Sequence, residues 1–212
     1  MHTIPINTEE NSLEILGGKG RSLARMTRSG FRVPDGFIVT ADAYRDFVNK
    51  CGIQEEIIEL AKPDLKNGYP NFEECSKKIQ LIIESNQTPD STRNEIIEAY
   101  EGLSGTDLRM AVRSSANAED LPELSFAGQQ ETFLNISTSA AIIESVHKCW
   151  ASLWTPQAIS YRHQNGIDQS SVAMAVVVQK MIPSEVSGIL FTANPSSGER
   201  SQIILNSSFG LG

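Results

Sequence analysis

The segment GGKG at 17–20 has the composition of a phosphate-binding turn. It places Lys19 among glycines directly before a helical pattern, where unpaired backbone N–H groups and the helix dipole favour an anion. Lys19 is followed by glycine rather than by serine or threonine, so the segment is not a Walker A loop. Taken alone, it fits a tight turn better than a binding loop.

A second segment, AVRSSA at 111–116, puts Arg113 at the end of an expected apolar strand. A guanidinium is planar and permanently charged, so it can hold phosphate oxygens in a fixed geometry. An ion pair with Glu119 or Asp120 explains the same position structurally. The following SFAGQ at 125–129 is rich in small residues, as a backbone needs for close approach to a polyphosphate, although a surface turn has the same composition.

A third candidate, Gln179-Lys180-Met181, follows an apolar run at 172–178 that is typical of a strand buried on both faces. A chain crossing between two lobes at this point can offer backbone groups to an adenine edge, and a glutamine amide can both donate and accept. A strand that simply leaves its sheet explains the spacing equally. The three histidines are widely separated, so we expect no metal-binding or acid–base role for them.

The elements expected around these segments alternate between helix and strand. Helices are expected at 21–29, at 41–50 with Thr40 as N-cap, through most of 53–102, at 139–154 and at 156–164. Strands are expected at 37–39, 108–112, 131–134, 172–178, 188–192 and 202–206.

Composition bounds the classes of function. With 40% hydrophobic and 21% charged residues, the 212-residue chain should fold around a packed core. The net charge of −8 argues against broad capture of nucleic acid or anionic membrane, so an anionic ligand must be held by local cations. Three widely spaced cysteines suggest neither a disulfide framework nor a zinc site, and no leader or membrane span is visible, so we expect a cytoplasmic protein.

Taken in order, these segments resemble the N-terminal nucleotide-binding domain shared by phosphoenolpyruvate synthase, pyruvate phosphate dikinase and rifamycin phosphotransferase. The resemblance begins near residue 15 and continues to the last residue, with 53–105 matching only in character. The matching stretches are GGKGRSLARMTRSGFRVPDGFIVTADAY at 17–44, AVRSSANAEDLPELSFAGQQETFLNI at 111–136, CWASLWTPQAISYRHQNG at 149–166, VAMAVVVQKMIPSEVSGILFTANPSSG at 172–198 and SFGLG at 208–212.

The resemblance implies an ATP-grasp-like fold of the α/β (α+β) class that clamps ATP between two lobes. It implies an N-terminal lobe at 1–180 with a helical insert at 53–105, and the incomplete start of a second lobe at 181–212. The implied site residues are Lys19 and Arg113 for the phosphates; Gly128, Gln129 and Thr132 for the loop over the polyphosphate; Gln179, Lys180, Met181 and Ile182 for the adenine; and Glu185 for the ribose.

The implied activity is that of pyruvate, water dikinase, in which ATP, pyruvate and water become phosphoenolpyruvate, AMP and phosphate through a phosphohistidine. The histidine domain and the substrate domain would be partners supplied elsewhere, and the Mg²⁺ ligands are expected beyond Gly212. We therefore expect a fragment of a longer phosphotransferase that alone binds ATP weakly and is inactive. Two alternatives stay open, an ATP-binding portion of a rifamycin phosphotransferase and a non-catalytic nucleotide-binding module.

Overall fold

The computed structural model describes residues 1–66, 69–103, 105, 108–116 and 131–211. The chain divides into two compact units, Met1–Lys180 and Met181–Gly212.

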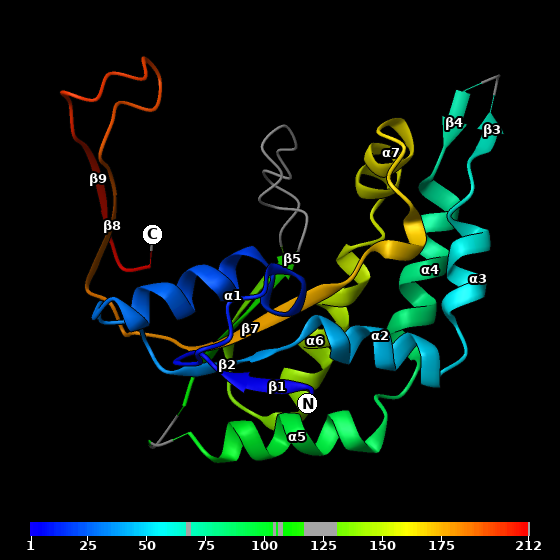
Figure 1. The fold of residues 1–212 in the computed structure, drawn as a ribbon, viewed down its shortest axis with the longest axis horizontal. Coiled ribbons are helices and arrows are strands. Elements are labelled where there is room, and N and C mark those ends of the chain that lie inside the picture. The colour runs from blue at the N-terminus through cyan, green and yellow to red at the C-terminus, as the bar shows by residue number, and fades with distance from the viewer. Residues whose placement is uncertain (67–68, 104, 106–107, 117–130, 212) are drawn as a thin grey trace. The chain divides into compact units, whose positions relative to one another are not determined.

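A five-stranded antiparallel sheet forms the centre of the first unit, in the order β1-β2-β7-β5-β6 (Figure 1). Helices and an antiparallel sheet together place this unit in the α+β class, as expected. The strands are β1 (Thr3–Pro5), β2 (Gly36–Val39), β5 (Met110–Ala116), β6 (Thr132–Ile136) and β7 (Met174–Lys180).

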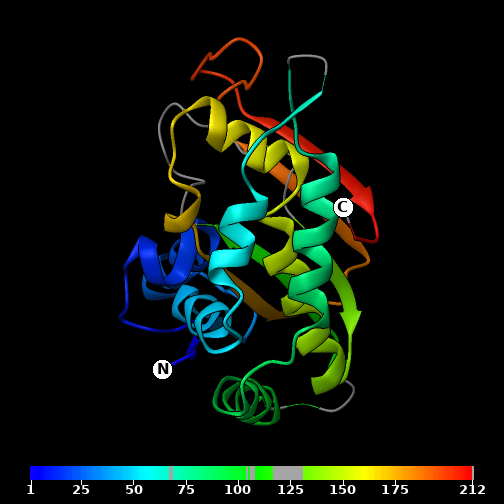
Figure 2. The same ribbon diagram turned by 90° about the vertical axis from the view of Figure 1, so that its right-hand side faces the viewer.

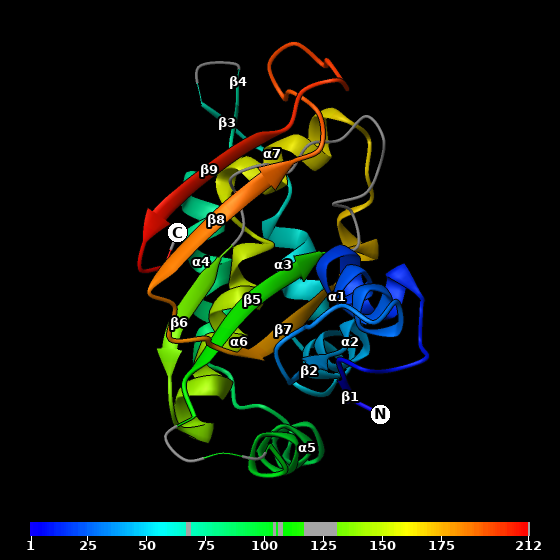
Figure 3. The same ribbon diagram turned by 90° about the vertical axis from the view of Figure 1, so that its left-hand side faces the viewer.

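Helices cover both faces of this sheet (Figures 1 and 3). One face packs against α1 (Leu13–Arg28), and the other packs against α2 (Ala41–Lys50) and α6 (Ser139–Ser152). Further helices surround these layers (Figure 2). These are α3 (Gln54–Leu60), α4 (Glu73–Ser85), α5 (Asp90–Glu101), α7 (Pro156–Gln164) and the short 3-10 helix η1 (Gln169–Ser171). In the part of the chain that the structure describes, no helix is both long and apolar enough to cross a bilayer.

Strand β7 lies between two hydrophobic clusters, which explains its continuous apolar sequence. Met174, Val176 and Val178 join the larger cluster with α2 and α6, whereas Ala175 and Val177 join a smaller cluster with α1. All five side chains are at most 4% exposed. The expected strand buried on both faces is thus confirmed, because successive side chains of a strand point to opposite faces.

Other expectations were wrong in detail. Strands β3 (Asp64–Lys66) and β4 (Tyr69–Asn71) form a hairpin inside the region expected to be helical, and β1 was not expected at all. Three residues are too few to display an alternating pattern, so sequence gives little sign of such strands. Strand β5 extends four residues further than expected, which places Arg113 in the middle of the strand rather than at its end.

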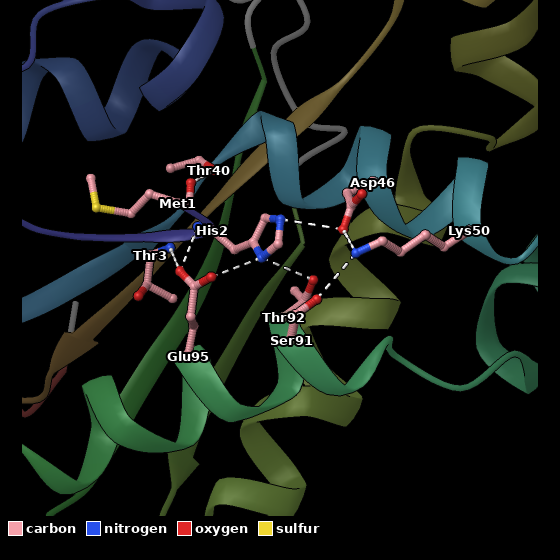
Figure 4. Close-up of polar contacts among 9 residues, drawn as sticks. All are labelled: Met1, His2, Thr3, Thr40, Asp46, Lys50, Ser91, Thr92 and Glu95. Atoms are coloured by element: carbon pink, nitrogen blue, oxygen red, sulfur yellow. Dashed lines mark hydrogen bonds and ion pairs between the residues drawn. The ribbon is translucent and has the colours of Figure 1, made fainter.

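The N-terminal strand is held by a polar cluster around His2 (Figure 4). The His2 backbone N–H donates to Glu95 Oε2 on α5 at 2.6 Å, and Nδ1 of its ring lies 3.0 Å from Glu95 Oε1. On the other side, Nε2 lies 3.3 Å from Asp46 Oδ2 on α2, an oxygen that also lies 2.7 Å from Lys50 Nζ. These contacts tie the edge strand β1 to two helices.

A second histidine is buried where α4, α5 and α6 meet. His147 is 7% exposed, stacks on Trp150 with ring centroids 5.6 Å apart, and has its Nε2 2.7 Å from Thr88 Oγ1. Burial lowers the pKa of His147, and a hydrogen bond with the Glu84 backbone opposes this only in part. The folded state therefore disfavours the charged form of this ring.

This burial predicts a pH dependence of stability. In the unfolded chain His147 is protonated near its ordinary pKa of about 6.5, whereas burial lowers the pKa of the folded ring. The stability that this pKa difference contributes is therefore fully present above about pH 6.5. It is lost as the pH falls towards the lowered pKa of the folded state. Urea unfolding of the wild type and of His147→Gln between pH 7.5 and 5 measures this dependence. Uptake of one proton lowers the free energy of unfolding by at most about 1.4 kcal/mol per pH unit, and the wild type should show this extra loss. Equal slopes in both proteins would contradict the prediction.

The second unit is a hairpin of β8 (Val186–Phe191) and β9 (Ile204–Phe209). The cross-strand partners Leu190 and Leu205 are 56% and 66% exposed. A two-stranded hairpin with apolar exposed side chains and unpaired edges is a template for association.

We expect the chain to associate through this hairpin as its concentration rises. The double variant Leu190→Lys/Leu205→Lys should remain monomeric, because a lysine on an edge strand opposes pairing with another strand. Size-exclusion chromatography with light scattering over a concentration series measures this. Leu81→Lys, at an exposed position on α4, is the matched control and should associate like the wild type. A wild-type chain that stays monomeric throughout would contradict the prediction.

Candidate functional site

Helix α1 is interrupted at Gly17, where φ is 66° and ψ is 175°. The GGKG segment, expected as a turn before a helix, is therefore a break inside a longer one. Glycine is required here for two reasons. The left-handed φ is costly for residues with a side chain, and a Cβ at Gly17 would lie 2.0 Å from the Ser115 carbonyl oxygen and 2.4 Å from Ser115 Oγ.

The break faces β5 and is bridged by a serine hydroxyl. Ser115 Oγ donates to the Leu16 carbonyl at 2.9 Å and accepts from the Gly20 N–H at 3.1 Å. Ser115 is completely buried. One hydroxyl thus satisfies a backbone acceptor before the break and a backbone donor after it, two groups that a broken helix leaves unpaired.

Lys19 lies between these two anchored positions. Its Nζ donates to the Ser114 carbonyl at 2.9 Å, so the ammonium group is held at β5. Ser114 directly follows Arg113 in the chain. The two cations predicted from distant segments are therefore brought to the same strand.

Arg113 belongs to a row of residues that crosses three strands. It is the register partner of Thr132 on β6 and of Val177 on β7. Cross-strand partners share a face of the sheet, and Val177 packs in the cluster with α1. Gln179 lies two residues beyond Val177 and opposite Ala111, so its side chain lies on the same face of the sheet as Val177. The α1 face of the sheet thus carries all of these positions.

The end of β7 is tied to the turn before β2. Gln179 is 8% exposed, and its Nε2 donates to the Pro34 carbonyl at 3.0 Å. The Lys180 N–H donates to the Asp35 carbonyl at 2.8 Å, and Lys180 Nζ lies 3.7 Å from Asp35 Oδ2. The Gln179 amide nitrogen is therefore engaged within the protein.

The structure does not place the remaining predicted residues relative to this arrangement. Gly128 and Gln129 lie outside the described residues, as do Glu119 and Asp120, the alternative partners of Arg113. Met181, Ile182 and Glu185 belong to the second unit.

Ser115 is the residue that sequence reasoning missed. Its segment was singled out for Arg113 alone, although a serine on a buried strand requires a partner for its hydroxyl. That partner is the helix break, which only the fold brings to the strand. The available signal was the combination of two serines after the arginine with a glycine pair elsewhere in the chain.

The chemistry that the site supports is the binding of a polyanion. Lys19 and Arg113 supply two positive charges at one strand, which offsets a net charge of −8 locally. Within the described ranges, no group of three or more His, Cys, Asp or Glu residues could hold a metal ion.

The break at Gly17 leads to a stability prediction. Gly17→Ala should lower the free energy of unfolding by about 3 to 4 kcal/mol, because it combines left-handed strain with a steric clash against β5. Gly30→Ala is the matched control, since Gly30 has a φ of 81° and nothing within 4 Å of an added Cβ. That variant should cost only about 1 kcal/mol. Urea unfolding compares them, and equal losses would contradict the close approach.

Comparisons with protein families and with individual proteins agree on one family. The sequence matches the family described as "Pyruvate phosphate dikinase, AMP/ATP-binding domain" over residues 13–212. It is 46% identical over 204 residues to a probable phosphoenolpyruvate synthase of Methanocaldococcus jannaschii, covering 94% of this chain and 17% of that protein.

Two further relatives are similar to the chain over nearly its whole length. A phosphoenolpyruvate synthase of Aeropyrum pernix is 44% identical over 206 residues, which is 94% of this chain and 25% of that protein. A rifampicin phosphotransferase of Streptomyces sviceus is 44% identical over 209 residues, which is 96% of this chain and 24% of that protein. The chain thus spans 17 to 25% of the length of these three relatives.

Proposed function

Because the chain belongs to the pyruvate phosphate dikinase AMP/ATP-binding domain family, we propose that it holds ATP with the polyphosphate on the α1 face of the sheet. The observation that carries this proposal is that Lys19 Nζ lies at the carbonyl of the residue after Arg113, with Thr132 as the register partner of Arg113. These two observations support a common phosphate site for two cations from distant segments and one hydroxyl residue.

Each predicted residue has a role in this proposal. Lys19 and Arg113 hold the phosphates, and Thr132 with the segment around Gly128 and Gln129 covers them. Gln179 and Lys180, with Met181 and Ile182, frame the adenine, and Glu185 contacts the ribose. Binding the adenine through the Gln179 side chain would require its hydrogen bond to Pro34 to be exchanged or shared.

We further propose an ATP-grasp-like arrangement, in which the unit Met1–Lys180 is the N-terminal lobe and the unit Met181–Gly212 begins a second one. We propose that Mg²⁺ accompanies the nucleotide, with its ligands largely in another part of the longer protein. A reaction that uses ATP favours the cytoplasm as the compartment.

The proposed activity of the longer protein is pyruvate, water dikinase. Phosphoryl transfer depends mainly on positioning and on neutralising charge on the phosphoryl oxygens. Lys19 and Arg113 supply both functions, and the proposed acceptor is a histidine on another domain, which then phosphorylates pyruvate on a substrate domain. This chain alone contributes the nucleotide site and no turnover.

A second candidate keeps this nucleotide site and changes the acceptor to a rifamycin. The observation that favours it is the 44% identity to the rifampicin phosphotransferase, equal to that of the Aeropyrum pernix synthase. A third candidate is a non-catalytic nucleotide-binding module. The presence of both Lys19 and Arg113 favours the enzyme over that module, because a module without chemistry has less need of two cations at the phosphates.

The test of the ATP site is titration calorimetry with ATP and magnesium. Arg113→Ala should weaken binding by about 1.5 to 3 kcal/mol, the range for hydrogen bonds to a charged group. Arg45→Ala is the matched control, because Arg45 is an exposed arginine on α2 whose partner is Asp42 at 2.7 Å. Binding that is undetectable at millimolar nucleotide, or unaffected by Arg113→Ala, would contradict the proposal.

A further inference from the structure

Three consecutive residues of β5 all bear on the proposed phosphate site. Arg113 supplies a cation, the Ser114 carbonyl accepts from Lys19 Nζ, and the Ser115 hydroxyl bridges the break in α1. The two backbone groups bound by Ser115 belong to Leu16 and Gly20, so they flank Lys19 on both sides.

We propose that Ser115 is a positioning residue for the nucleotide phosphates, and that it acts by fixing the backbone from which Lys19 reaches β5. The inference rests on the proposed function, because it takes Lys19 to be a phosphate ligand. It adds a residue that is buried and does not itself contact the nucleotide.

The geometry makes the hydroxyl specific. A hydroxyl donates once and can accept as well, and Ser115 uses both capacities, one on each side of the break. Alanine at this position would leave the Leu16 carbonyl and the Gly20 N–H without this partner in a buried place. The break would then lose the two hydrogen bonds that bridge it to β5, and the Lys19 ammonium would sample positions away from Arg113.

The close approach of Gly17 to β5 supports the same conclusion. The backbone of Gly17 approaches Ser115 so closely that a Cβ there would lie 2.4 Å from Ser115 Oγ. The helix therefore contacts the strand at the hydroxyl itself. Small displacements of the break are thus transmitted to Ser115, two residues from Arg113.

The first arm of the test is a double-mutant cycle on ATP affinity. Ser115→Ala should weaken ATP binding about tenfold in the wild-type background, the scale expected for one lost hydrogen-bonded contact. In the Lys19→Ala background the same change should have little further effect, because residues that act through one another are not additive. Titrations followed by NMR to millimolar ATP give the four dissociation constants.

A matched control separates positioning from general stability. Ser76 is also buried, and its hydroxyl donates to the Trp154 carbonyl at 2.6 Å. Ser76→Ala should lower the melting temperature as Ser115→Ala does, yet leave ATP affinity unchanged. If Ser115→Ala does not fold, Ser115→Cys takes its place, because a thiol keeps the shape with weaker hydrogen bonding.

The second arm needs no ligand. Hydrogen exchange of the Gly20 amide should become at least about tenfold faster in Ser115→Ala and stay unchanged in Ser76→Ala, because only the first loses the acceptor of that amide. Unchanged Gly20 exchange in Ser115→Ala would overturn the inference whether or not ATP binds.

The two arms keep the two proposals distinguishable. Suppose that the wild type binds ATP. If Ser115→Ala then weakens ATP affinity equally in the wild-type and Lys19→Ala backgrounds, or does not weaken it in either, the positioning role is overturned while the nucleotide site stands. If the wild type does not bind ATP, the proposed function fails in this chain. The Gly20 exchange then still decides whether Ser115 holds the break.

Discussion

The close approach of α1 to β5 is the contact on which the rest of the site depends. It requires a glycine at position 17 and a serine at position 115, since the backbone of one lies against the carbonyl and hydroxyl of the other. Through this contact a lysine on a helix comes to the strand that carries Arg113. Two cations repel each other, so the position of Lys19 at this strand is a consequence of backbone packing.

The sheet supplies the second constraint. Because β5 lies between β7 and β6, Arg113 has a register partner on each side, and its facing is set by the alternation of both neighbours. The apolar members of that alternation, such as Val177, bury against α1. Burial of the apolar side chains thus determines which residues of the sheet lie on the α1 face, and the polar residues in the same alternation lie on that face too.

Much of this could be predicted from sequence, but unevenly. The continuous apolar run of β7 and the helices α2 and α7 are strong local signals, and the structure confirms them. Thr40 does precede α2 as expected, but its side chain makes no capping hydrogen bond and its hydroxyl donates to the Met1 carbonyl instead. The order of several segments together indicated the family. None of these signals contains distance information, so the contact of Lys19 with the Ser114 carbonyl could not be foreseen. The short strands β1, β3 and β4 depend on partners along the chain and leave no periodic trace.

The order of strands also determines when the sheet can form during synthesis. Its central strand, β7, is the last of the five in the chain, and it joins the pair β1–β2 to the pair β5–β6. Until residues 174–180 leave the ribosome, those two pairs have no common neighbour and their apolar faces remain open to water. Non-local pairing of this kind slows folding, so the nascent first unit passes through an interval in which chaperones or premature aggregation compete for it.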